Sequence, residues 1–179
     1  MTRITTGRLA AAVLLAVLLA GITLATAFAT PSDLQLAKAA TARFNSIEQA
    51  EAAGYGLPPE GPLHECITSL DGTGAMGFHL INGSLLDTVV DPAQPEALVY
   101  APDRNGKLKL VALEYVVFQE PWQEESGPDA MAPMLFGEMF METGAPNRYE
   151  IPAFYALHAW IWDENPAGAF APFNEDVSC

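Results

Sequence analysis

The chain has 179 residues, half of them hydrophobic, and its 22 acidic residues outnumber its 8 basic ones to give a net charge of −14. This balance excludes nucleic acid and anionic membrane surfaces as partners, because both require a basic surface that can displace counterions or meet lipid charge. The length suits one domain with a substantial core.

The first 29 residues have the pattern of an export signal. Arg3 and Arg8 form a basic start, an uncharged run rich in Ala, Val, Leu and Ile follows, and Ala27-Phe28-Ala29 matches a cleavage site. Uncleaved, the run is about 20 residues long and sufficient for a transmembrane helix. We therefore predict a signal peptide or membrane anchor in residues 1–29 and a single exported domain in residues 30–179, either secreted or in the cell envelope.

Cys66 and Cys179 are the only cysteines in the sequence. In an exported chain, paired thiols oxidise and stay oxidised, so we predict a disulfide between them. In the chain-entropy model, closing so long a loop is worth about 4 to 5 kcal/mol. The alternatives are two free thiols or a thiolate metal ligand.

Apolar residues recur at three- and four-residue steps in segment 32–53, which predicts a helix. Ser46, with Gln49 three residues later, has the pattern of a capping box that restarts the helix, and Gly54 is suited to end it. We expect two helical pieces, followed by an irregular proline-rich stretch at 57–62.

Alternating apolar residues predict strands at 75–81, 96–101, 107–118 and 153–162. The turn sequence at 102–106 should join the second and third strands into an antiparallel hairpin. An acidic, proline-bearing loop is expected at 120–133. The predicted fold class is α+β, with the N-terminal helical segment packed on an antiparallel β-sheet and long Pro-rich loops at its rims.

Three polar residues interrupt the apolar pattern of these strands. Strict alternation places Glu114 on one face with Leu108, Leu110, Ala112, Val116 and Phe118. The same rule places His158 on one face with Phe154, Ala156, Trp160 and Trp162. His79 lies in the middle of its strand, and Gly77 on the same face leaves space that could admit a ligand.

An inward Glu114 needs a partner, because a buried carboxylate costs several kcal/mol unless it is paired or ligated. If Glu114, His79 and His158 converge, they form a set of two histidines and one carboxylate that can hold a transition metal such as zinc, iron or copper. The alternatives are a hydrogen-bonded cluster that supports the core, or an outward-facing set. His64, close to Cys66, is a candidate fourth ligand.

Four methionines, Met131, Met134, Met139 and Met141, lie within eleven residues. Thioethers suit Cu(I), but methionine also fills irregular apolar gaps, so packing is the alternative interpretation. The sequence contains no nucleophile elbow, phosphate loop, dinucleotide fingerprint or paired-histidine zinc helix. Enzyme status and substrate therefore stay open.

Short segments across most of the exported domain carry a family resemblance. They are Ala50-Glu51-Ala52-Ala53-Gly54-Tyr55, Gly74-Ala75-Met76-Gly77-Phe78-His79, Leu113-Glu114-Tyr115, His158-Ala159-Trp160-Ile161-Trp162, Asn165-Pro166-Ala167-Gly168-Ala169-Phe170 and Val177-Ser178-Cys179. In these segments the chain resembles a family of uncharacterised exported bacterial proteins, found mostly in actinobacteria and environmental bacteria. The resemblance implies an exported location and no particular chemistry.

Three hypotheses for function follow. The first is an exported domain with a metal site formed by His79, Glu114 and His158. The second is a non-catalytic envelope binding module with a pocket for an apolar or carbohydrate ligand, lined by Phe154, Trp160, Trp162 and Phe170. The third is a structural or interaction protein anchored by its uncleaved leader, which would be its only contact with the membrane.

Overall fold

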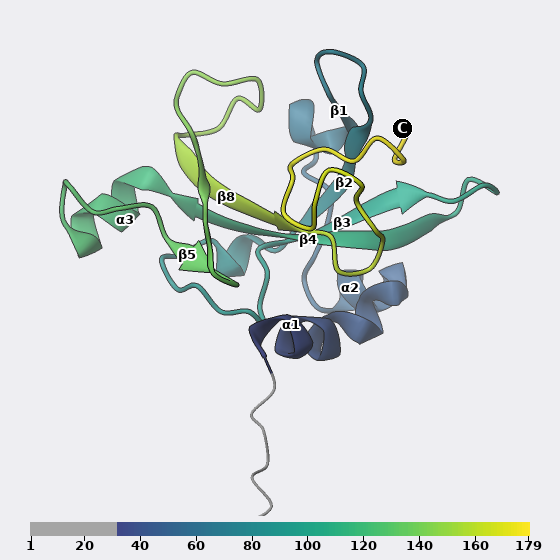
Figure 1. Cartoon of the computed structure of the whole chain (residues 1–179), viewed down its shortest axis with the longest axis horizontal. Coiled ribbons are helices and arrows are strands. Elements are labelled where there is room, and N and C mark those ends of the chain that lie inside the picture. The colour runs from purple at the N-terminus through teal and green to yellow at the C-terminus, as the bar shows by residue number, and fades with distance from the viewer. Residues whose placement is uncertain (1–31) are drawn as a thin grey trace, which may run out of the picture. The chain divides into compact units, whose positions relative to one another are not determined.

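A six-stranded antiparallel sheet organises residues 32–179, the part of the chain that the computed structural model describes (Figure 1). The order across this sheet is β1-β2-β3-β4-β8-β7, and β5 and β6 form a separate two-stranded ribbon. The strands are β1 (Ile67–Thr68), β2 (Ala75–Ile81), β3 (Ala97–Pro102), β4 (Leu108–Phe118), β5 (Met134–Leu135), β6 (Glu138–Met139), β7 (Met141–Thr143) and β8 (Phe154–Ala159). A mixed α+β class, mostly β, is thus confirmed.

The predicted leader, residues 1–29, lies outside the described residues. Within residues 32–179, no helix combines the length and the apolar character needed to cross a bilayer.

The N-terminal helical segment consists of α1 (Asp33–Thr41), the 3-10 helix η1 (Ala42–Asn45) and α2 (Ile47–Ala52). The Ser46 hydroxyl accepts a hydrogen bond from the Gln49 amide at 3.4 Å and so caps α2. Gly54 follows with a φ of 94°, a conformation that glycine adopts without strain. The predicted two-piece helix is confirmed.

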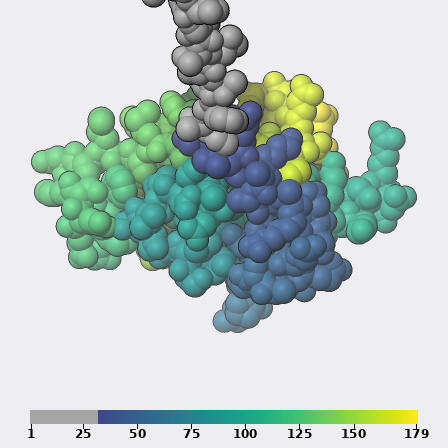
Figure 2. Space-filling view, turned by 90° about the horizontal axis from the view of Figure 1, so that it is seen from below, coloured from purple at the N-terminus to yellow at the C-terminus, as the bar shows by residue number. Residues whose placement is uncertain are grey.

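One face of the sheet packs against this helical segment. Ala37, Phe44 and Ala50 belong to the same core cluster as the large strand residues Leu98, Tyr100, Leu113, Tyr115 and Val117. Figure 2 looks onto this side, where residues of the helical segment, in purple and blue, lie beside teal residues from the middle of the chain. We call it the helix face.

The opposite face carries smaller side chains, and loops cover it. Its core cluster consists of Ala75, Val99, Ala101, Val111, Ala112, Trp160 and Val177. The C-terminal tail crosses this face, where backbone hydrogen bonds join Asn174 to Ala75 in both directions, at 3.1 and 3.0 Å. We call it the loop face.

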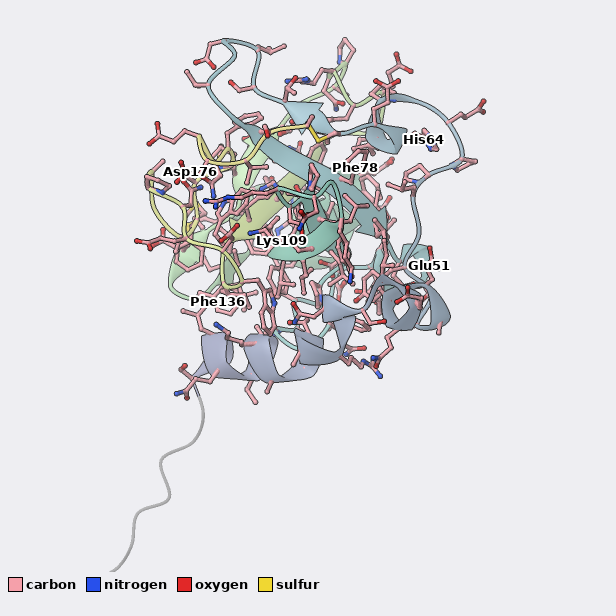
Figure 3. All side chains as sticks on the ribbon, turned by 90° about the vertical axis from the view of Figure 1, so that its right-hand side faces the viewer. Glu51, His64, Phe78, Lys109, Phe136 and Asp176 are labelled. Carbon is pink, nitrogen blue, oxygen red and sulfur yellow. A yellow bond between two sulfur atoms is a disulfide. The ribbon has the colours of Figure 1, made fainter. Side chains whose placement is uncertain are left out.

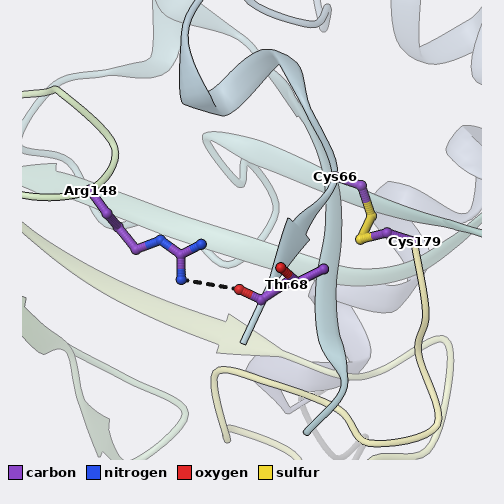
Figure 4. Close-up of a disulfide and its surroundings, with 4 residues drawn as sticks. All are labelled: Cys66, Thr68, Arg148 and Cys179. Atoms are coloured by element: carbon purple, nitrogen blue, oxygen red, sulfur yellow. Dashed lines mark hydrogen bonds between the residues drawn. A yellow bond between two sulfur atoms is a disulfide. The ribbon is translucent and has the colours of Figure 1, made fainter. Parts of the chain in front are cut away.

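A disulfide joins the tail to the region of β1 (Figure 4). It links Cys66 to Cys179, whose Cα atoms are 5.6 Å apart although 113 positions separate them in the sequence. The predicted pairing is confirmed. A disulfide of this kind persists in an oxidising compartment, which points to a location outside the cytoplasm.

The β3–β4 hairpin is present, but its register differs from strict alternation. Val99 lies opposite Ala112 while Tyr100 lies opposite Leu110, so Val111 is an extra residue in β4. Such a bulge moves the residues before it to the other face. Leu108 and Leu110 accordingly pack on the helix face, and the prediction that they share a face with Glu114 was wrong.

Two other segments differ from prediction. Residues predicted as an acidic loop form α3 (Gln119–Ser126), and Pro121 is compatible with this helix because it lies in the first turn, where its missing N–H is not needed. Strand β8 ends at Ala159, and Trp162 packs on the helix face with its indole N–H donating to the Thr41 hydroxyl at 3.2 Å. Two short 3-10 helices, η2 (Pro62–His64) and η3 (Gly83–Leu85), complete the fold.

Candidate metal centre

Three polar side chains from three strands meet on the loop face. Glu114 of β4 lies directly opposite His158 of β8. His79 lies on β2, separated from β4 by β3, which presents Val99 opposite His79 and Ala97 opposite Glu114. Because Ala97 and Val99 are small, His79 and Glu114 can reach each other across the roughly 10 Å that two strand spacings span.

The contacts within the cluster are similar in length. His79 Nε2 lies 3.3 Å from Glu114 Oε2, and His158 Nε2 lies 3.6 Å from Glu114 Oε1. The two Nε2 atoms are 3.4 Å apart. One ligand atom of each residue therefore lies within 4.8 Å of the others, which makes the three residues a possible metal-binding triad. The predicted convergence of His79, Glu114 and His158 occurs.

Burial disfavours the charged form of all three side chains in this cluster. The side chains of His79 and His158 are 2% and 4% exposed and that of Glu114 is 13% exposed. Desolvation lowers the pKa of both imidazoles far below the usual range, and it raises the pKa of the Glu114 carboxyl to about 8. Neutral imidazoles keep the lone pairs that a metal ion requires, whereas the Glu114 proton must leave for that residue to bind one.

Packing orients the two histidine rings. His158 stacks on Trp160 at a centroid distance of 6.4 Å and an interplanar angle of 19°, and the Trp160 indole donates to the Ala171 carbonyl at 2.6 Å. The His79 ring meets that of His158 edge to face at 5.7 Å. Metal-bound histidines generally donate their second ring N–H to an acceptor. Nδ1 of His79 is buried without a hydrogen-bond partner, so that restraint is absent at His79.

Gly77 does not leave the ligand space predicted beside His79. A Cβ atom at this position would lie 2.5 Å from the carbonyl oxygen of Tyr100, and the φ of Gly77 is 120°. The backbone of β3 therefore fills this space. Glycine is required at position 77 because the strands approach closely there.

The remaining candidate ligands lie outside the triad. His64, in η2, is exposed, and its Nδ1 atom lies 2.7 Å from the Pro58 carbonyl oxygen; Figure 3 shows it near the edge of the molecule. The four methionines are 49–73% exposed, and Met134 pairs with Met139 across the β5–β6 ribbon. Of these methionines only Met141 lines the cavity beside the triad.

The triad forms part of the wall of a cavity of about 220 Å³ on the loop face. Most of the other lining side chains are apolar and come from the strands, η2, the residue after η3, the 144–153 loop and the tail: Leu63, Ile67, Met76, Ile81, Leu86, Ala97, Val116, Phe118, Met141, Ile151, Phe154, Ala156, Pro172 and Phe173. Glu96, Thr143 and Tyr149 are the other polar lining residues. No Lys or Arg is among the described residues that line it.

Two of these polar residues escaped sequence reasoning. Glu96 lies directly before the first residue of β3. Its carboxylate accepts a hydrogen bond from the Val116 amide N–H at 2.8 Å, in place of a backbone carbonyl of β3. Burial raises the pKa of Glu96 to about 8. Tyr149 belongs to a loop that Arg148 ties to β1 through a 3.0 Å hydrogen bond to the Thr68 carbonyl (Figure 4). An acid at a strand start and a loop tyrosine carry no signal of burial in the sequence.

Only one of the four aromatic residues named in the second hypothesis lines the cavity. Phe154 lines the cavity, whereas Trp160 is buried in the core of the loop face, and Trp162 and Phe170 pack on the helix face. The other aromatic residues in the cavity wall are Phe118, Tyr149 and Phe173.

Comparison with known proteins identifies no relative: no family model, no curated protein and no solved structure matches this chain.

Proposed function

We propose that this protein binds a zinc ion through Nε2 of His79, Nε2 of His158 and the carboxylate of Glu114. The single observation that carries the proposal is the convergence of the triad: the two Nε2 atoms lie 3.4 Å apart, and each lies 3.3 or 3.6 Å from a different oxygen of the Glu114 carboxylate. Tetrahedral zinc with bonds of 2.0–2.1 Å holds its ligand atoms about 3.3 Å apart.

The same distances favour zinc coordination over two other arrangements. Neighbouring ligands of an octahedral ion would lie about 2.9 Å apart at similar bond lengths, closer than the 3.4 Å that separates the two Nε2 atoms. Charge-assisted hydrogen bonds between imidazolium and carboxylate are about 2.7–2.9 Å long, shorter than the 3.3 and 3.6 Å separations here. Each neutral imidazole keeps a lone pair on one ring nitrogen, and that nitrogen is Nε2 when the proton is on Nδ1.

Three protein ligands leave zinc one open position. Because all three triad residues line the cavity, a fourth ligand would approach from there. Zinc in such a position can act as a Lewis acid towards a bound molecule or lower the pKa of bound water.

Elemental analysis tests the proposal. The wild-type protein, purified without a chelating tag, supplied with zinc and then desalted, should retain about one equivalent. The His79→Ala, His158→Ala double variant should retain none, and His64→Ala is the matched control because it removes an exposed histidine outside the triad. Circular dichroism verifies that each variant folds.

Two results would contradict zinc binding. One is a folded wild type that retains no zinc after supply, and the other is a folded double variant that retains as much as the His64→Ala control. Replacing zinc by Co(II) adds a test of geometry, because tetrahedral Co(II) absorbs visible light far more strongly than octahedral Co(II). Weak absorption would argue against the tetrahedral site.

We also propose that the protein is exported and belongs to the exported bacterial family that it resembles. The disulfide and the leader-like pattern of residues 1–29 support this. Fractionation of expressing cells, with mass spectrometry of the N-terminus, should find the protein outside the cytoplasm and show whether cleavage follows Ala29. A protein confined to the cytoplasm with reduced cysteines would refute export.

A further inference from the structure

The cavity above the triad selects its occupant by size, polarity and charge. Its volume of about 220 Å³ is below the roughly 300–1,000 Å³ usual for drug-sized ligands. Fourteen of the twenty lining residues are apolar, so most of a bound molecule must be apolar as well. A sugar would leave several hydroxyls without hydrogen-bond partners, which costs free energy for each one.

The charge of the cavity narrows the class of ligand further. No cationic side chain lines the cavity, so the described residues offer no salt bridge to an anion. With zinc in place, two neutral imidazoles, the Glu114 carboxylate and a divalent cation leave a net charge of +1, to which Glu96, the other carboxyl group of the wall, adds nothing while it is protonated. A monoanionic head group neutralises this charge, whereas a phosphate ester or a cation would leave an uncompensated charge among apolar walls.

We infer that the protein binds a small molecule with an apolar body and a single carboxylate, which coordinates the open position of the zinc ion while the body fills the cavity. This inference rests on the zinc site proposed above and adds the class of ligand. Octanoate is a suitable probe, since it combines a short apolar chain with one carboxylate.

Two further features fit this mode of binding. Glu96 is 2% exposed and lines the same cavity, so its carboxyl, in the neutral form, can donate a hydrogen bond to a ligand oxygen. Ile67 of β1 and Phe173 of the C-terminal tail both line the cavity, and the Cys66–Cys179 disulfide joins their segments on one side of it. The apolar part of the cavity is therefore covalently restrained on that side.

Calorimetric titration of the zinc-loaded full protein tests the inference. Octanoate should bind at least tenfold more tightly than acetate, which lacks the apolar body, and than octylamine, which carries the opposite charge. Removing zinc should weaken octanoate binding at least tenfold. Equal affinity for the three probes, or octanoate affinity that does not depend on zinc, would overturn the inference.

A variant that fills the cavity separates this inference from the zinc site. Ala156, on β8, lines the cavity without being a triad residue, so Ala156→Leu should lower octanoate affinity at least tenfold and still retain one zinc. Ala52→Leu makes the same change at an exposed position of α2 and should alter neither property.

The outcomes for zinc and for octanoate are distinguishable. A wild type without zinc overturns the proposed function, and the inference fails with it. A wild type with one zinc that does not prefer octanoate, or an Ala156→Leu variant that keeps full octanoate affinity, overturns the inference alone.

Discussion

The two faces of the sheet are packed in different ways. On the helix face, Leu98, Tyr100, Leu113 and Tyr115 are at most 1% exposed, and large side chains fill the space up to the helical segment. On the loop face, the sheet contributes the small residues Ala97, Val116 and Ala156 to the wall of a cavity that holds every polar residue of the candidate site. A binding site needs volume that the core does not fill, and small side chains on one face supply it.

The largest expected effect on stability comes from the disulfide, which restrains segments of the loop face. A Cys66→Ser, Cys179→Ser double variant should lose about 4 to 5 kcal/mol of unfolding free energy, because its unfolded chain is freed from a loop of 113 residues. Denaturant titration measures the loss. A reductant should destabilise the wild type by a similar amount and leave the variant unchanged, whereas a loss below about 1 kcal/mol would refute this role of the disulfide.

Truncation of neighbouring valines compares the packing of the two faces directly. Val117 is 1% exposed on the helix face, whereas Val116, the preceding residue of β4, is half-buried and lines the cavity. Val117→Ala should cost about 2 to 3 kcal/mol, and Val116→Ala less than about 1 kcal/mol, because part of the Val116 side chain already faces empty space. Equal costs in thermal unfolding would show that the faces are packed alike.

The carboxyl in the loop face should make stability depend on pH. In zinc-free protein with a chelator present, the raised pKa of Glu114, about 8, means that the folded state holds a proton that the unfolded state releases above its ordinary pKa of 4.5. This contribution to stability is complete below pH 4.5 and is lost as the pH rises to 8. Glu114→Gln removes the titration.

The stability of Glu114→Gln relative to wild type should therefore increase by about 2 kcal/mol between pH 6 and pH 8. Glu96 titrates in both proteins, and the charge of Glu114 is the smallest of the causes that raise its pKa, so most of its effect cancels in the difference. Glu51→Gln, an exposed position on α2, is the matched control and should run parallel to wild type. A Glu114→Gln curve that also runs parallel to wild type would rule out a protonated Glu114.

Local patterns were sufficient to predict much of this structure. Ser46 and Gln49 indicated the break between α1 and α2, and alternation in 75–81 located β2 and His79. The triad itself was predictable because Glu114 interrupts an apolar strand, and burial of a carboxylate demands a partner. The pairing of Cys66 with Cys179 needed only the absence of other cysteines and the prediction of an oxidising compartment.

Other features had no local signal. Pro121 suggested a loop, yet the segment forms α3 because proline is compatible with a first helical turn. Trp162 continued the alternation of β8 but packs on the helix face, where Thr41, 121 positions earlier, accepts its N–H. Contacts at such separations cannot be read from spacing.

The amino-acid order alone identified which residues are polar in apolar strands, and hence which side chains were candidates to meet. Their meeting point depended on the fold: the bulge at Val111 moved Leu108 and Leu110 to the helix face, and the register placed Glu114 opposite His158. Periodicity is a property of neighbouring residues, whereas the cavity is enclosed by η2, β1, the 144–153 loop and the tail. These segments come together only when the whole chain has folded, so the volume they enclose has no counterpart in local sequence.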